Sequence, residues 1–154
     1  MTTSKTTGSA SVHIDASPAV IYDYLTNLDL LPGLSPENVR CEYLDGATTI
    51  EIGAKFRGHN KSGDYEWHAD CVVTGLDPGR SFEYEVPPNF EHATTWRYSI
   101  EADDKSGGSV VTESFSAPML ALPDVYPGKI EGRRDNLERA CETTLANLKA
   151  ALEG

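Results

Sequence analysis

The sequence predicts an α+β fold in which a curved antiparallel sheet of about seven strands wraps around a long C-terminal helix, with two short helices after the first strand. Turn signals follow one another at short spacing through the middle of the chain, so successive strands have no room for crossover helices and pair antiparallel. Apolar residues recur at helical spacing near the C-terminus. The length of 154 residues is typical of one globular domain.

The N-terminal part predicts a strand and then two short helices. Residues 1–9 are small and polar, which favours a disordered tail followed by a single domain over residues 10–154. Residues 11–15 alternate with period two and form the first predicted strand. Ser17 is a typical helix N-cap, and Pro18 suits the first helical position. A second short helical turn follows over residues 28–31 and ends before a Pro-Gly pair.

The central part of the chain predicts six further strands, separated by turns rich in Gly, Pro and Asp. They are expected over residues 39–44, 49–58, 65–76, 81–86, 94–102 and 109–117. Gly53 and Gly58 are expected to bend the sheet. The segments 87–92 and 119–127 are expected as loops near the cavity mouth. Their apolar residues form either an entrance lid or a contact patch for a second subunit.

The long C-terminal helix is predicted by an apolar stripe along one face, roughly 24 residues and 36 Å long. The stripe consists of Ile130, Leu137, Cys141, Leu145, Leu148 and Leu152. A curved sheet that grips such a helix usually leaves a cavity between the two, and small-molecule pockets are found in concavities of this kind.

Strand alternation turns an aromatic and hydroxyl-bearing set of side chains toward this cavity. The candidate ligand-binding residues are Phe56, Tyr65, Trp67, Tyr84, Trp96, Tyr98, Glu113, Phe115, Leu137 and Cys141. Tyr and Trp offer an apolar body with a polar tip, so a flat, oxygenated and hydrophobic ligand suits the set. The alternative is that these side chains only fill the core.

Glu113 is the exception among these inward positions, because its neighbours Val111 and Phe115 are typical core residues. A carboxyl group there would be desolvated and its pKa raised, as a general acid or base requires. Glu113 and Tyr98 are therefore the candidate catalytic pair. Two alternatives stay open: Glu113 pairs with Arg133 or Arg134 at the start of the long helix, or a bulge turns it outward.

Charge and motif content exclude several classes of function. Lys plus Arg number 13 and Asp plus Glu number 24, so the net charge is −11 and nucleic acid is an unfavourable partner. No apolar run is long enough to insert stably in a membrane. The three cysteines have no metal-binding spacing, which favours a reduced, cytoplasmic protein with Cys71 and Cys141 as inert core thiols. The four histidines form no ligand motif and no nucleotide-binding motif is present, so we expect no metal and no cofactor.

Several short motifs resemble those of a known family. They are VHIDASP at residues 12–18, LDLLP at 28–32, GAKFRG at 53–58, DPGRSF at 77–82 and TWRY at 95–98. Over about residues 10–153 the sequence resembles the START-like (birch-pollen-allergen-like) helix-grip fold of the SRPBCC superfamily, and within it the bacterial polyketide cyclase/dehydrase branch. The resemblance implies a hydrophobic cavity and no fixed catalytic motif, because the family mixes aromatase/cyclases with lipid and hormone carriers.

These observations favour a protein that binds a small hydrophobic or aromatic molecule, lipid- or polyketide-like, between the sheet and the C-terminal helix. One alternative is a polyketide cyclase/aromatase-type enzyme that catalyses aldol cyclisation and dehydration, with Glu113 and Tyr98 or Tyr84 moving protons. A further alternative is a regulatory protein-interaction module. Both a monomer and a homodimer agree with the sequence.

Overall fold

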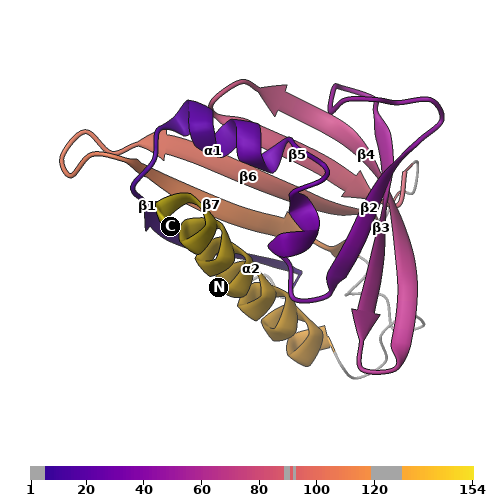
Figure 1. Ribbon diagram of the computed structural model, residues 1–154. Coiled ribbons are helices and arrows are strands. Elements are labelled where there is room, and N and C mark those ends of the chain that lie inside the picture. Colours follow the sequence, from indigo (N-terminus) through magenta and orange to yellow (C-terminus); the bar gives the residue numbers. More distant parts are fainter. Residues whose placement is uncertain (1–5, 89–90, 92, 119–129) are drawn as a thin grey trace.

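The computed structural model describes residues 6–88, 91, 93–118 and 130–154, with residues 62 and 130–134 described by their backbone alone. Over this part of the chain, one seven-stranded antiparallel sheet has the order β1-β7-β6-β5-β4-β3-β2. The strands are β1 (Thr7–Ile14), β2 (Asn38–Leu44), β3 (Lys55–Ser62), β4 (Tyr65–Asp77), β5 (Ser81–Val86), β6 (Thr94–Ala102) and β7 (Ser109–Ser116). The predicted helix-grip α+β fold is confirmed (Figure 1).

Three helical elements pack against this sheet. The long helix α2 (Ile130–Glu153) lies against β1 and β7, α1 (Pro18–Leu25) lies against β5 and β6, and the 3-10 turn η1 (Leu31–Gly33) lies against β2. Figure 1 shows β2 and β3 running steeply across the direction of β6 and β7, so the sheet is strongly curved. The helical elements therefore lie on the concave side of the sheet (Figure 1).

The first strand begins earlier than the sequence predicts. Residues 7–9, expected in a disordered tail, belong to β1 and pair with residues 114–116 of β7. These small polar residues carry no apolar alternation, so only pairing with β7 reveals the strand. Gly8 contributes to the close approach, because a Cβ there would lie 2.7 Å from the Phe115 ring. Residues 1–5 of the expected tail lie outside the described residues.

The start of α1 is confirmed as predicted. The Ser17 hydroxyl accepts a hydrogen bond from the Val20 backbone N–H at 3.3 Å, and Pro18 is the first helical residue. The side chain therefore satisfies one of the backbone N–H groups that a helix leaves without an intrahelical partner.

The strand predicted over residues 49–58 is also wrong in its bounds. Residues 49–54 form irregular backbone and β3 begins only at Lys55, so Ile52 is 61% exposed instead of facing inward. Gly53 has a φ of +87° and its N–H donates to the Val73 carbonyl at 2.8 Å, which sets a tight turn where alternation predicts a strand. Gly58, predicted as a bend, lies in β3 and pairs regularly with Cys41 and Ala69.

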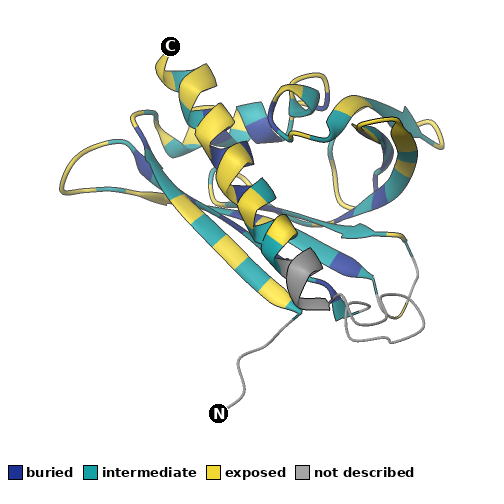
Figure 2. Cartoon of the chain, turned by 90° about the horizontal axis from the view of Figure 1, so that it is seen from below, coloured by how far each residue is buried: buried dark blue, intermediate teal, exposed yellow. Residues whose placement is uncertain are grey.

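The core lies where α1, α2 and the sheet meet. Its fully buried large side chains include Ile14, Ile21, Leu25, Phe82, Leu145 and Leu148. Buried residues alternate with half-buried ones along β7, and exposed residues alternate with half-buried ones along most of β1 (Figure 2). The β6–β7 turn closes against the end of β1 through Gly108, whose φ is +71° and where a Cβ would lie 2.4 Å from the Ile14 carbonyl oxygen.

Polar contacts fix α2 over the sheet at its C-terminal half. The Lys149 ammonium donates to the His13 carbonyl at 2.8 Å, and the Glu153 carboxylate accepts from the Asp15 N–H at 2.8 Å. The Asn147 amide donates to the Leu34 carbonyl at 2.7 Å, which ties the end of η1 to the helix. These bonds fix α2 to the end of β1 and to η1.

Candidate ligand-binding cavity

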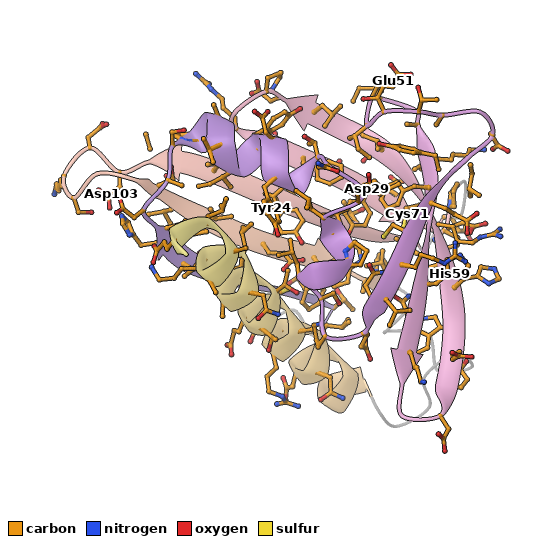
Figure 3. All side chains as sticks on the ribbon, viewed as in Figure 1. Tyr24, Asp29, Glu51, His59, Cys71 and Asp103 are labelled. Carbon is orange, nitrogen blue, oxygen red and sulfur yellow. The ribbon has the colours of Figure 1, made fainter. Side chains whose placement is uncertain are left out.

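A cavity of about 410 Å³ lies between the concave face of the sheet and the helical elements. Its walls come from β2 to β7, from the segment around η1 and from α2. Cys71, labelled in Figure 3, is a buried wall residue of β4. His59, labelled in the same figure, alternates along β3 with the wall residues Gly58 and Asn60 and is not part of the lining.

Aromatic side chains form much of the wall: Phe56, Trp67, Tyr84, Trp96 and Tyr98. The Phe56 ring meets the Tyr84 ring edge-on at 5.5 Å, and Tyr84 and Trp96 are paired neighbours on β5 and β6. The five rings are distributed over four strands (β3–β6), and the edge-to-face contact helps to hold Phe56 and Tyr84 in place.

The structure brings eight of the ten sequence-predicted site residues to the cavity wall. They are Phe56, Trp67, Tyr84, Trp96, Tyr98, Glu113, Leu137 and Cys141. Tyr65 does not line it: the residue is 68% exposed at the start of β4, and its ring stacks on Trp67 at 5.2 Å. Phe115 is buried instead in a second core cluster with Ala117 and Cys141, where its ring contacts Trp96 at 5.4 Å.

Glu113 is 4% exposed and lies on the cavity wall. Its strand pairs without interruption, with Glu113 opposite Tyr98 on one side and Ala10 on the other, so the bulge alternative is wrong. Burial raises the pKa of this carboxyl group to about 8, while hydrogen bonds from the Tyr98 hydroxyl and the Cys141 thiol act in the opposite direction. The predicted desolvated carboxyl group is therefore present in the structure, and it is mostly protonated at neutral pH.

One oxygen of this carboxyl group has no partner. Oε1 of Glu113 is buried and accepts or donates no hydrogen bond within the described part of the chain. The side chains of Arg133 and Arg134, the alternative partners predicted from the sequence, lie outside the described residues.

Four other titratable groups on the cavity wall keep their protons. Burial raises the pKa of the Tyr84 and Tyr98 hydroxyl groups well above their usual range, and the nearby Glu113 carboxyl group adds to both shifts. Burial likewise raises the pKa of the Cys71 and Cys141 thiols. Because the thiolate is the reactive form of cysteine, these two thiols are poor nucleophiles.

Sequence reasoning missed a polar group at the other end of the cavity. The Asn38 amide donates to the Asn60 side-chain oxygen at 3.1 Å and accepts from the Cys41 thiol at 3.2 Å, and Glu37 and Ser35 adjoin it on the wall. Asn60 follows Phe56 and Gly58 at period two, so correct bounds for β3 would have placed it on the inward face.

The two loops expected at the cavity mouth are only partly described. Residues 89, 90, 92 and 119–129 lie outside the described residues. The described residues that flank them, Val86, Thr94 and Ala117, do line the cavity. Among the residues that the structure does describe, no group of His, Cys, Asp and Glu could hold a metal ion, and no helix is long and apolar enough to cross a membrane.

Comparison with known proteins identifies the family. Residues 5–153 match the model of a family described as polyketide cyclase/dehydrase and lipid transport. The chain belongs to this family. The match covers nearly all of the chain and agrees with the resemblance carried by the sequence motifs. No curated protein is significantly similar in sequence.

Solved structures share the fold over nearly the whole chain. The polyketide-cyclase-like protein Cgl2372 from Corynebacterium glutamicum is 26% identical, with a TM-score of 0.66 and coverage of 99% of this chain and 94% of that one. Protein CV1439 from Chromobacterium violaceum is 15% identical, with a TM-score of 0.73 and coverage of 97% and 99%. The two-domain aromatase/cyclase StfQ of the steffimycin pathway is 18% identical, with a TM-score of 0.71; the match covers 96% of this chain and 50% of StfQ.

Proposed function

We propose that the protein binds a small hydrophobic or aromatic molecule, polyketide- or lipid-like, in the cavity between the sheet and α2. The observation that carries this proposal is a space of about 410 Å³ walled by five aromatic side chains. Ligand pockets in proteins are typically about 300–1,000 Å³ and mostly apolar, with a few placed polar groups. Empty space of this size costs stability in a core that serves packing alone.

The protein carries its own reporters of cavity binding. Its two tryptophans, Trp67 and Trp96, both line the cavity, so a ¹H–¹⁵N NMR spectrum holds two indole N–H signals and both report on the site. We use acetylnaphthalene, a flat and uncharged two-ring ketone, as the probe. Titration is expected to shift both signals in a saturable way. Trp67→Phe and Trp96→Phe assign the two signals.

A matched pair of variants tests whether the probe enters the cavity. Ala69 of β4 lines the cavity and His68 beside it is exposed. Ala69→Phe fills the space and is expected to weaken binding by at least about tenfold, whereas His68→Phe adds a ring outside it. Indole signals that do not respond to the probe, or an equal affinity in the two variants, would contradict cavity binding.

A second candidate function is a cyclase/aromatase-type enzyme, and the protonated Glu113 beside Tyr98 favours it. An aldol addition moves a proton from the nucleophilic carbon to the carbonyl oxygen, and dehydration then removes a carbon-bound proton and the hydroxyl group as water. A carboxyl group with a pKa of about 8 both gives and takes a proton near neutral pH, so one group serves both steps.

Glu113→Gln separates the two functions, because the amide keeps the shape of the side chain and cannot exchange a proton. The substrate probe is the methyl ester of a linear trioxooctanoic acid, which becomes an aromatic ring on aldol closure and loss of water. Ring formation by the parent protein above the uncatalysed rate, lost in Glu113→Gln while acetylnaphthalene still binds, supports the enzyme. Binding without ring formation in either protein supports the carrier.

A further inference from the structure

The described wall of the cavity carries acidic side chains and no basic ones. Among the wall residues that the structure describes, Glu37 and Glu113 carry carboxyl groups and none is Lys, Arg or His. An anion taken from water into this space would meet no counter-charge among these described residues and would lie near two acidic side chains. Burial of an unpaired charge is costly, so the wall disfavours carboxylate and phosphate ligands.

Glu113 adds a preference for a ligand that accepts a hydrogen bond. Oε1 of Glu113 is buried and has no hydrogen-bond partner within the described part of the chain, and Glu113 lies on the cavity wall. When the neutral carboxyl group carries its proton on Oε1, this O–H is a buried donor without an acceptor among the described residues. The terminal torsion of a Glu side chain is broad, so a small rotation turns this O–H toward the cavity. A buried donor left unpaired is unfavourable, so a ligand that supplies an acceptor is favoured.

We propose that the ligand is an uncharged ring compound whose carbonyl oxygen accepts a hydrogen bond from the neutral Glu113 carboxyl group, and that the cavity rejects anions such as fatty-acid carboxylates. This inference rests on the proposed function and narrows it to a chemical class. A carbonyl oxygen supplies the acceptor that the described protein groups do not supply, and its ring body fits the aromatic wall formed by Phe56, Tyr84 and Trp96.

The neighbours of Glu113 determine how this preference depends on pH. The strand β6 presents Tyr98, β5 presents Tyr84 and α2 presents Cys141, while β1 presents the non-titrating Ala10. Elevated pKa values keep the two phenols and the thiol protonated, so Glu113 is the group of this set that titrates near pH 8. Once ionised it has no proton to donate, and the preference for a carbonyl oxygen disappears.

Three probes of nearly equal shape test the inference through the indole signals: acetylnaphthalene, ethylnaphthalene and naphthoate. At about pH 6.5 the ketone is expected to bind about tenfold more tightly than the hydrocarbon, and naphthoate at least about tenfold more weakly than the ketone. At about pH 9.5 the ketone is expected to lose its advantage while the hydrocarbon keeps its affinity.

Two substitutions at position 113 assign the effect to this side chain. The amide of Glu113→Gln still donates and does not titrate, so the preference for the ketone is expected at both pH values. Glu113→Leu is expected to remove the preference at both. Equal affinities for ketone and hydrocarbon at about pH 6.5, or tightest binding by naphthoate, would overturn this inference and leave cavity binding intact. No indole shift with any probe would overturn both.

Discussion

Replacing Glu113 with glutamine is expected to change how the stability of the protein depends on pH. The pKa of the carboxyl group is about 8 in the folded protein against an ordinary value of 4.5. The folded state therefore holds this proton more tightly than the unfolded state does, and stability falls wherever the unfolded state has lost the proton and the folded state has not. The contribution is complete below pH 4.5 and is lost as the pH rises to about 8.

The size of the effect follows from the width of this interval. It spans about 3.5 pH units, and each unit corresponds to about 1.4 kcal/mol, so the loss in the parent protein is at most about 5 kcal/mol. Any water entry or side-chain movement that solvates the carboxylate reduces it. Glutamine does not titrate, so it makes no such pH-dependent contribution to stability over this range. The free energy of unfolding of Glu113→Gln minus that of the parent is therefore expected to rise from pH 4.5 to about 8 and to be flat on either side.

Urea unfolding followed by tryptophan fluorescence, at half-unit steps of pH, measures this difference. Both proteins share the carboxyl groups whose pKa is lowered by partners, such as Asp70 beside Arg57, and these destabilise the fold on the acid side. Subtracting one curve from the other removes that shared part. If the difference in the free energy of unfolding stayed constant through neutral pH, Glu113 would already be ionised in the folded protein and could not act as a neutral donor.

Three further predictions, each with a control substitution, test the fold. Gly108 and Gly46 both have positive φ, but only at Gly108 would a Cβ meet nearby backbone. In chemical unfolding, Gly46→Ala is therefore expected to lower the free energy of unfolding by about 1 kcal/mol, and Gly108→Ala by distinctly more. Phe82→Ala empties a site that is 1% exposed and is expected to cost about 3–5 kcal/mol, against less than about 0.5 for the exposed Val39→Ala. Ser17→Ala removes the cap of α1 and is expected to lower the free energy of unfolding by about 1 kcal/mol, with Ser17→Asp restoring most of it.

Most strand and helix bounds could be predicted because their signals are local. Asp77-Pro78-Gly79 sets the turn before β5, which was predicted with its observed bounds. The apolar stripe of α2 depends only on spacing along the helix. In contrast, the start of β3 depends on the bond from Gly53 to the Val73 carbonyl, a contact with a strand that comes later in the chain. No window of sequence around residue 53 contains that information.

In the candidate site, too, some positions follow from local sequence and others depend on contacts with distant parts of the chain. Alternation correctly placed Trp67 and Glu113 on the inward side, because their strands are regular there. It failed for Tyr65, which has the same parity as Trp67 but is 68% exposed at the first residue of β4. The position of a residue in the two-residue repeat gives the face of the strand on which it lies, whereas its burial depends on which other elements cover that face. The polar end around Asn38 was missed because it arises from contacts between β2 and β3.

The contrast between two carboxyl groups of this protein argues for a functional role of Glu113. Both oxygens of Asp70 are bonded by the Arg57 guanidinium, at 2.6 and 3.1 Å, as befits a carboxylate with a structural task. Glu113 lies between the core positions Val111 and Phe115 with one oxygen unpartnered within the described residues. An apolar side chain would pack there without the desolvation penalty. A group that costs stability, faces a cavity and lacks one bond suits a site whose last partner is a ligand. Under the proposed function, the feature that weakens the fold at alkaline pH would also select the ligand.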